Sequence, residues 1–177
     1  QTRDVGHYAA NPWGFFDMHG NVWEWTADRY GAYPGGPVTD PAGATSGTTR
    51  IKRGGYWSNA GSDLRSANRV SYIQSSRRDS LGFRVGFKFT GAHTVPSASS
   101  LEMLWVEPGS FTMGSPTSET GRGTDETEHN VTLTKGFYLG KYEVTQAQYE
   151  AVMTGNSNGL SATPSTWPGN PNRPVEK

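Results

Sequence analysis

Apolar residues recur along this chain in short alternating runs, with few stretches long enough for a helix. The clearest run is residues 83–89, Phe-Arg-Val-Gly-Phe-Lys-Phe, in which every second side chain is aromatic or aliphatic. Alternation with a period of two is typical of a strand that buries one face, so this segment is predicted to form a strand. Shorter apolar runs predict further strands at residues 22–26, 49–53, 103–106, 110–114, 131–134 and 137–142.

One helix is predicted over residues 144–153. Thr145 stands three residues before Gln148, which is the spacing of a capping box at the start of a helix. Residues 63–68 are expected to form a short helix or an irregular turn. Elsewhere 23 glycines and 11 prolines favour turns. The pattern therefore predicts an α+β fold that is irregular and loop-rich, with short antiparallel strands and few helices.

A segment of small and polar residues at 90–100 is predicted to be a linker. It divides the chain into a leading half, residues 1–89, which is rich in turns, and a trailing half, residues 101–177, which carries the predicted helix. The two halves do not resemble each other in sequence, so the chain shows no internal repeat.

Composition limits the kinds of partner. With 16 basic and 16 acidic residues, the chain lacks the electrostatic footprint expected for binding to nucleic acid or an anionic membrane. No apolar run approaches the ~18 residues of a spanning helix, so membrane insertion is not expected. The 6 tryptophans, 8 tyrosines and 7 phenylalanines are expected to supply the core, because each ring buries a large area.

Candidate chemistry is limited by the absence of cysteine, which excludes a disulfide framework, a thiolate metal site and a cysteine nucleophile. The histidines show no metal-ligand spacing; they are His7, His19, His93 and His129. The arginines within residues 65–78 are expected to form a mixed, solvated face. The acidic residues at 125–128 are either a cation site or a solvated loop.

Six sequence motifs occur together in this chain and carry a family resemblance. They are Gly20–Trp25 (Gly-Asn-Val-Trp-Glu-Trp), Arg53–Gly55, Gly82–Arg84, Phe111–Gly114 (Phe-Thr-Met-Gly), Glu128–Val131 and Glu143–Tyr149 (Glu-Val-Thr-Gln-Ala-Gln-Tyr). Together they resemble the sulfatase-modifying factor, or formylglycine-generating enzyme (FGE-sulfatase), family, whose fold is similar to C-type lectins. The resemblance covers nearly everything except the linker, and it implies a C-type-lectin-like fold.

The order of these motifs departs from the family. The leading half resembles the family's C-terminal portion, the trailing half resembles its N-terminal portion, and a middle portion is missing. The chain is therefore either a circularly permuted domain or a piece across the boundary of two tandem domains. The missing middle favours the second interpretation, because permutation relocates sequence without deleting it. If the middle normally completes the core, self-association by strand or domain exchange is expected.

The resemblance also implies metal sites. It implies a calcium site made by the side chains of Asp17 and Glu24 and the carbonyls of Gly20 and Val22, and calcium prefers such hard oxygen ligands. The alternative is that Asp17 caps a turn and Glu24 pairs with an arginine. The family's enzymes bind copper with a pair of cysteines after the Arg-Gly-Gly motif. Because this chain has none, copper is not expected and no catalytic residue is assigned.

Candidate ligand-binding residues lie between positions 56 and 78, in a segment rich in Ser, Asn, Tyr, Arg and Trp, the mixture found on adaptable recognition surfaces. They are Tyr56, Trp57, Ser58, Asn59, Arg65, Asn68, Arg69 and Tyr72. An ordinary polar surface is the alternative.

Five other residues have predicted structural roles. Trp23 and Trp25 should share one strand face and pack in the core, or else form a platform for carbohydrate. The glycines that follow Arg53 are expected to have positive φ. Arg84 is expected to form an ion pair or bond to backbone.

Three functions are compatible with these features. The leading one is a non-catalytic, calcium-stabilised lectin-like module that binds a protein, a peptide or a glycan. The second is a part of a formylglycine-generating enzyme whose catalytic cysteines are absent here. The third is a structural spacer in a surface or secreted array. An extracellular or periplasmic location is expected.

Overall fold

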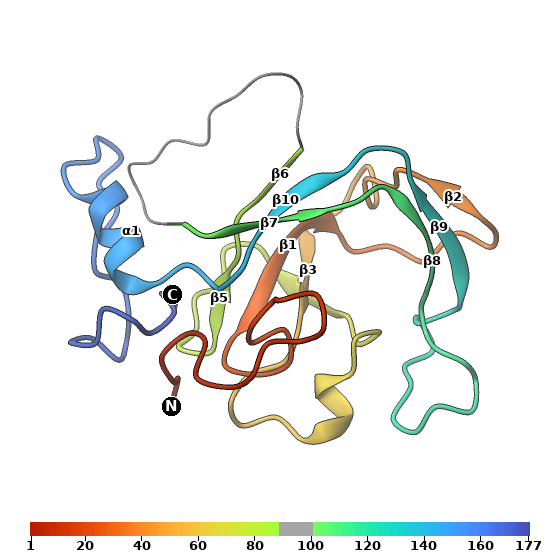
Figure 1. Cartoon of the computed structure of the whole chain (residues 1–177), viewed down its shortest axis with the longest axis horizontal. Helices are drawn as coiled ribbons and strands as arrows, with labels where there is room; N and C mark the ends of the chain where they lie inside the picture. Colours follow the sequence, from red (N-terminus) through yellow and green to blue (C-terminus); the bar gives the residue numbers. More distant parts are fainter. Residues whose placement is uncertain (89–100) are drawn as a thin grey trace.

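Ten short strands form three sheets in residues 1–88 and 101–177, the part of the chain that this computed structural model describes (Figure 1). The strands are β1 Trp23–Arg29, β2 Val38–Thr39, β3 Thr49–Arg53, β4 Val70–Ile73, β5 Leu81–Phe83, β6 Gly86–Lys88, β7 Met103–Val106, β8 Gly109–Met113, β9 His129–Leu133 and β10 Phe137–Gly140. A 3-10 turn, η1, spans Gly61–Leu64, and one helix, α1, spans Gln146–Met153. These elements confirm the predicted loop-rich α+β fold.

The largest sheet lies within the leading half and has the order β4-β3-β1-β5. Strand β1 pairs antiparallel with β3 and parallel with β5. The core around this sheet includes Val22, Trp23, Ile51 and Leu81, each at most 4% exposed. Since a fully buried aliphatic or aromatic side chain contributes roughly 1.5–3 kcal/mol, these contacts stabilise the centre of the fold. The predicted core role of Trp23 is confirmed.

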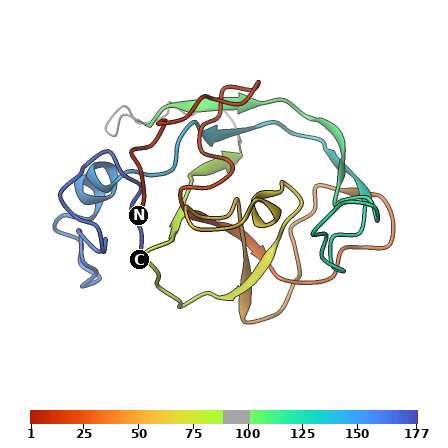
Figure 2. The ribbon, with the colours of Figure 1, turned by 90° about the horizontal axis from the view of Figure 1, so that it is seen from below.

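The other two sheets combine strands from both halves. β6 pairs with β10, which also pairs with β7, and β2 pairs in parallel with β9, which also pairs with β8. Tyr138 of β10 lies against Phe87 and Trp105 on the neighbouring strands, with ring centroids 5.4 and 5.0 Å apart. Figure 2 shows the strands of the trailing half, in green and blue, running along one side of the leading half. Neither sheet is complete without both halves.

The predicted strand at residues 83–89 is divided in two, so this prediction is wrong in part. β5 ends at Phe83, β6 begins at Gly86, and the two strands belong to different sheets. The break turns the Arg84 side chain into the protein, where it is 2% exposed. Phe89 and the predicted linker at 90–100 lie outside the described residues. The sequence pattern also does not predict the short strands β2 and β4.

The predicted capping box of α1 is confirmed. The Thr145 hydroxyl accepts a hydrogen bond from the Gln148 N–H at 3.2 Å, and the Thr145 N–H donates to the Gln148 side-chain oxygen at 3.0 Å. These bonds satisfy two N–H groups in a helix of only eight residues, none of which is buried. In the described residues no helix is long and apolar enough to cross a membrane.

The N-terminal and C-terminal segments lie on the same side of the molecule (Figure 2). The Asn170 side chain donates to the Asp4 carboxylate at 2.7 Å, and the Val175 N–H donates to the Val144 carbonyl at 2.8 Å. The Lys177 N–H donates to the Arg78 carbonyl at 3.1 Å. The last residues therefore lie near α1 and β5 (Figure 1).

Candidate functional site

The buried Arg84 joins the turn before β1, β1 itself and the trailing half. Its guanidinium donates to both oxygens of Glu24, with the shortest contact at 2.8 Å. It also donates to the carbonyls of Phe16 at 2.8 Å, Gly140 at 3.0 Å and Lys141 at 2.7 Å. The predicted structural role of Arg84 is confirmed, since it makes both an ion pair and backbone hydrogen bonds.

A carboxylate from the trailing half lies beside this ion pair. Glu143 is 1% exposed, and its oxygens accept hydrogen bonds from the Asn21 side chain at 2.7 Å and the Val22 N–H at 3.3 Å. Burial raises the pKa of Glu143 well above its ordinary value, and the charges of Glu24 and Asp17 raise it further. Three carboxyl groups thus lie near one arginine, and burial together with their mutual repulsion disfavours the charged form of Glu143.

The four residues predicted as a calcium site lie on the turn that enters β1. Asp17 accepts a hydrogen bond from the Gly6 N–H at 2.6 Å, and burial raises the pKa of Asp17. The bond to Asp17 and the ion pair of Glu24 with Arg84 agree with the alternative interpretation, in which Asp17 caps a turn and Glu24 pairs with an arginine. The carbonyl oxygens of Gly20 and Val22, however, accept no hydrogen bond from any described residue, although both residues are buried.

This set of oxygens fits a hard divalent cation. Buried carbonyls without a partner are unfavourable unless something else satisfies them, and calcium takes such carbonyls together with carboxylates. A cation would favour the charged forms of the neighbouring carboxyl groups. No three His, Cys, Asp or Glu side chains within residues 1–88 and 101–177 are placed to hold a metal ion by themselves. A cation held here would therefore need the backbone carbonyls as ligands.

A loop at residues 56–68, between β3 and β4, is held from inside the protein. The Arg53 guanidinium donates to three consecutive loop carbonyls, at residues 66–68, over 3.2–3.4 Å, and to the Tyr33 hydroxyl at 2.6 Å. The two glycines after Arg53 have φ of 87° and 75°, as predicted, and this left-handed conformation favours glycine. The loop therefore leaves β3 in a defined direction.

Further hydrogen bonds fix the start of the same loop. The Asn59 side chain accepts from the Tyr56 N–H at 2.9 Å and donates to the Asp63 carboxylate at 2.8 Å. Trp57 is 43% exposed, and its ring packs edge-on against the Tyr56 ring with centroids 5.5 Å apart. Ser58 is also exposed. Of the predicted binding residues, Tyr56 to Asn59 are thus brought together on one ordered loop.

Two other predicted binding residues use their side chains inside the protein. Asn68 donates to the Asp63 carbonyl at 2.6 Å. The Arg69 guanidinium lies over the rings of Tyr30 and Tyr33, 4.8 and 4.1 Å from the ring centroids, and the side chain is 2% exposed. The side chains of Asn68 and Arg69 therefore contact the protein itself and stabilise the loop.

Arg65 makes an ion pair between the two halves. It contacts both oxygens of Glu126, at 2.7 and 2.8 Å, and Glu119 at 2.7 Å. Glu126 is 2% exposed and accepts a hydrogen bond from the Ser115 hydroxyl at 2.7 Å. Bonding to Arg65 lowers the pKa of Glu126 to about 2. The expectations of a solvated arginine face and a solvated acidic loop are wrong at these two residues, because each neutralises the other on burial.

Glu143 and Asn21 belong to the site but are not assigned to it by the sequence. Glu143 opens the Glu-Val-Thr-Gln motif, and Asn21 follows Gly20. One feature of the sequence could have indicated Glu143. It lies between two apolar residues, Tyr142 and Val144, where a buried side chain is expected. The partners are 122 residues apart, a separation that no local pattern reveals.

Comparison with known proteins identifies the family. The profile of the FGE-sulfatase family, described as the sulfatase-modifying factor enzyme 1-like domain, matches residues 1–87 and again residues 88–176. The chain belongs to the FGE-sulfatase family. This FGE-sulfatase chain is similar to the serine/threonine-protein kinase pkn1 of Chlamydia caviae, with 39% identity over 88 residues, which are 47% of this chain and 14% of the kinase.

The FGE-sulfatase chain is also similar to the formylglycine-generating enzyme of Streptomyces coelicolor. The two are 35% identical over 103 residues, which are 57% of this chain and 32% of that enzyme. The chain thus spans less than a third of either relative. Among solved structures, Treponema denticola variable protein 1 matches 47% of this chain and 31% of its own, with 32% identity and a TM-score of 0.45.

Proposed function

We propose that this chain is a non-catalytic, calcium-stabilised FGE-sulfatase module that binds a protein or a glycan through residues 56–78, chiefly through the loop at 56–68. The observation that carries the proposal is Trp57, an exposed ring on a loop that Arg53 and Asn59 hold in place. Absence of cysteine supports the non-catalytic part, because no thiolate is available to bind copper.

The order of the loop favours recognition. A side chain that is already held in its bound position loses less conformational entropy on binding, so more of the contact energy appears as affinity. Tryptophan is also enriched among the residues that dominate binding energies. The neighbouring Ser58 and Asn59 supply hydrogen-bonding groups of the kind that recognition loops use.

Glycan and peptide arrays test the binding function. The variant Trp57→Ala should lose binding by tenfold or more, since truncating a central aromatic contact removes roughly 2 kcal/mol. Trp13→Ala is the matched control, because Trp13 is 81% exposed and lies outside the loop. Equal binding by both variants and the wild type would reject the loop as the site. A blank array from a folded sample would instead favour a structural spacer.

Calcium is the second part of the proposal. Two carbonyls of buried residues, Gly20 and Val22, support it because they have no hydrogen-bond partner within residues 1–88 and 101–177. The three carboxyl groups near Arg84 also support it. The ion would be held by these carbonyls and by the Asp17 and Glu24 carboxylates, and it would stabilise the turn that enters β1.

We also propose that the two halves form one permuted domain within a single chain. The shared sheets β6-β10-β7 and β2-β9-β8 support this arrangement. Light scattering after size exclusion tests it: a monomer is expected at micromolar concentration. A dimer that persists on dilution would indicate exchange of halves between copies.

A second candidate is a part of a larger formylglycine-generating enzyme, which the 35% identity to the Streptomyces coelicolor enzyme favours. The discriminating experiment is mass spectrometry of a cysteine-containing substrate peptide after incubation with copper and this chain. Conversion of the peptide cysteine to formylglycine would support the enzyme and overturn the non-catalytic proposal.

A further inference from the structure

A cavity of about 340 Å³ opens where β1, β5, α1 and the C-terminal segment meet. Its walls include three rings, those of Trp25, Phe83 and Tyr149, and the turn at residues 74–77 after β4 also lines it. Phe83 and Tyr149 pack edge-on with centroids 6.4 Å apart, so this wall is fixed. The volume lies at the lower end of the range for small-molecule sites.

The turn at 74–77 supplies polar groups that the protein itself does not use. In the described part of the chain, the side chains of Gln74, Ser75, Ser76 and Arg77 make no hydrogen bond or ion pair. Gln74, Ser75 and Arg77 are exposed. An amide, two hydroxyls and a guanidinium are therefore free to bind a ligand at the mouth of an aromatic pocket.

Two basic side chains outside the pocket lie close to the aromatic residues next to it. The Lys52 ammonium lies over the rings of Trp23 and Tyr72, 4.6 and 4.3 Å from their centroids. Arg78 donates to the hydroxyl of Tyr72, a predicted binding residue, at 3.0 Å. The neighbouring ring of Trp25 is 6.1 Å from Tyr72. Lys52 and Arg78 thus both contact Tyr72, whose ring lies beside Trp25, and Arg77 lines the pocket itself.

The carboxylate that lines the pocket, Glu176, is already satisfied. It is 1% exposed and accepts hydrogen bonds from the N–H groups of Thr166 and Trp167 at 3.0 and 3.1 Å. These bonds hold its oxygens, and in the described residues it forms no ion pair with Arg77.

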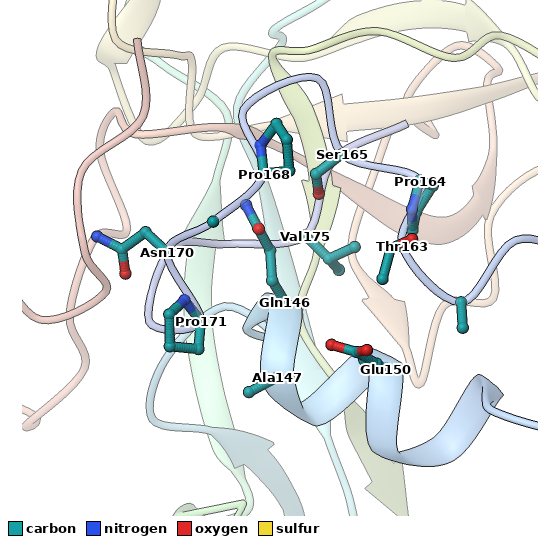
Figure 3. A pocket seen from close by; sticks show the side chains of 12 residues that line it. Gln146, Ala147, Glu150, Thr163, Pro164, Ser165, Pro168, Asn170, Pro171 and Val175 are labelled. Atoms are coloured by element: carbon teal, nitrogen blue, oxygen red, sulfur yellow. The ribbon is translucent and has the colours of Figure 1, made fainter.

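A second, smaller cavity lacks the aromatic and basic side chains that line the first. It holds about 210 Å³ between α1 and the loop at residues 162–171, and shares Pro164 and Val175 with the larger cavity. Figure 3 shows Gln146 and Glu150 on α1 facing the proline-rich loop. The Gln146 amide already donates to two carbonyls. No aromatic ring or cation from the described part of the chain lines this cavity, so the larger one is the better ligand site.

We infer that the pocket at Trp25 and Arg77 binds an acidic saccharide. The C–H face of a pyranose packs on an aromatic wall by dispersion, and a guanidinium forms paired hydrogen bonds with a carboxylate. The free amide and hydroxyls of Gln74, Ser75 and Ser76 match sugar hydroxyls. This assigns the carbohydrate role considered for Trp23 and Trp25 to Trp25 alone, since Trp23 is buried.

The inference rests on the proposed binding function, because the pocket uses the end of the same 56–78 segment. The two remain separable. Trp57→Ala tests the loop, and Arg77→Gln tests the pocket. If Trp57→Ala loses array binding but still binds sugar at Trp25, the loop and the pocket are both supported as separate sites.

The test is an NMR titration of the 177-residue chain with D-glucuronate, with D-glucose as the neutral control. Glucuronate should shift the Trp25 indole N–H and the amides of residues 74–77, with a Kd on the order of 1 mM. Glucose should bind about tenfold more weakly, because it lacks the charge-assisted contact. Arg77→Gln should reduce glucuronate binding to the level of glucose. Lys135→Gln, a charge removal on the turn between β9 and β10, should leave it unchanged.

Four results would overturn the inference. The first is the absence of shifts at Trp25 and residues 74–77 with glucuronate. The second is equal binding of glucose and glucuronate, and the third is equal affinity of the Arg77 and Lys135 variants for glucuronate. The fourth is a pocket that responds only to an acidic peptide such as oligoglutamate, which would assign it to a protein ligand. Trp25→Leu is a second variant that should weaken both sugars, with its thermal transition measured to verify folding.

Discussion

The ion pair between Arg65 and Glu126 is expected to be a major link between the two halves, and Glu126→Gln tests it. The change keeps the shape of the side chain but removes its charge. Glu126 is 2% exposed and contacts Arg65 through both oxygens. Arg65 retains Glu119 at 2.7 Å and the Gly121 carbonyl at 2.6 Å, so its charge is not left without a partner.

The magnitude follows from the pKa of Glu126. The carboxyl has an ordinary pKa of 4.5 and a pKa of about 2 in the folded protein, a difference that corresponds to about 3 kcal/mol of stability at neutral pH. Removing one partner of a buried pair costs about 3–5 kcal/mol when the other charge is left alone. Because Arg65 keeps other partners, the expected loss is about 2–3 kcal/mol.

The pH dependence has a defined sign. A lowered carboxyl pKa stabilises the folded state above pH 4.5, and this stabilisation is lost as the pH falls toward 2. The difference between wild type and Glu126→Gln should therefore be full at pH 7 and less than half as large at about pH 3.

Urea unfolding followed by tryptophan fluorescence measures the effect. Glu119→Gln is the matched control: it removes a charge from the same arginine, but Glu119 is 35% exposed, so its loss should be below about 1 kcal/mol. A loss for Glu126→Gln that is no larger than the control's, or one that does not change between pH 7 and pH 3, would refute the reasoning.

Two further predictions concern local geometry. Thr145→Ala removes the capping box of α1 and should lower the free energy of unfolding by about 1 kcal/mol; no change in urea unfolding would contradict a role for the cap. Gly114 has φ of 105°, and a Cβ there would lie 2.6 Å from the Thr127 carbonyl oxygen. Gly114→Ala should therefore destabilise by about 2 kcal/mol or more. Gly109→Ala, where no atom lies within 4 Å of a Cβ, is its control, and equal losses in the two variants would reject the steric argument.

Features that depend on local sequence could be predicted, and those that depend on packing could not. The β3 and β7 bounds and the capping box at Thr145 follow from periodicity and spacing. The strand at 83–89 was expected to continue because its side chains alternate, but the buried contacts of Arg84 divide it. Those contacts involve Phe16 and Gly140, which periodicity cannot place beside Arg84.

In the candidate site, too, features set by local sequence could be predicted and features set by packing could not. The four residues that the family resemblance suggests as calcium ligands are neighbours in sequence, between positions 17 and 24. This spacing does not indicate that Glu143 enters the cluster from the trailing half, or that Arg69 is buried between two tyrosines. Such contacts arise only when the two halves pack together, and charged residues at these positions have the same local pattern as residues on a solvated surface.

The most direct test of the account is thermal unfolding of this chain with millimolar calcium and with a chelator. One bound ion at about a hundredfold over its Kd should add roughly 2.7 kcal/mol, which raises the Tm of a domain of this size by about 5–10 °C. The account predicts one cooperative transition that moves up with calcium, and an Asp17→Asn variant whose transition does not move. A single transition at the same temperature in calcium and chelator would contradict the calcium site, and the lack of any cooperative transition would contradict a single permuted domain.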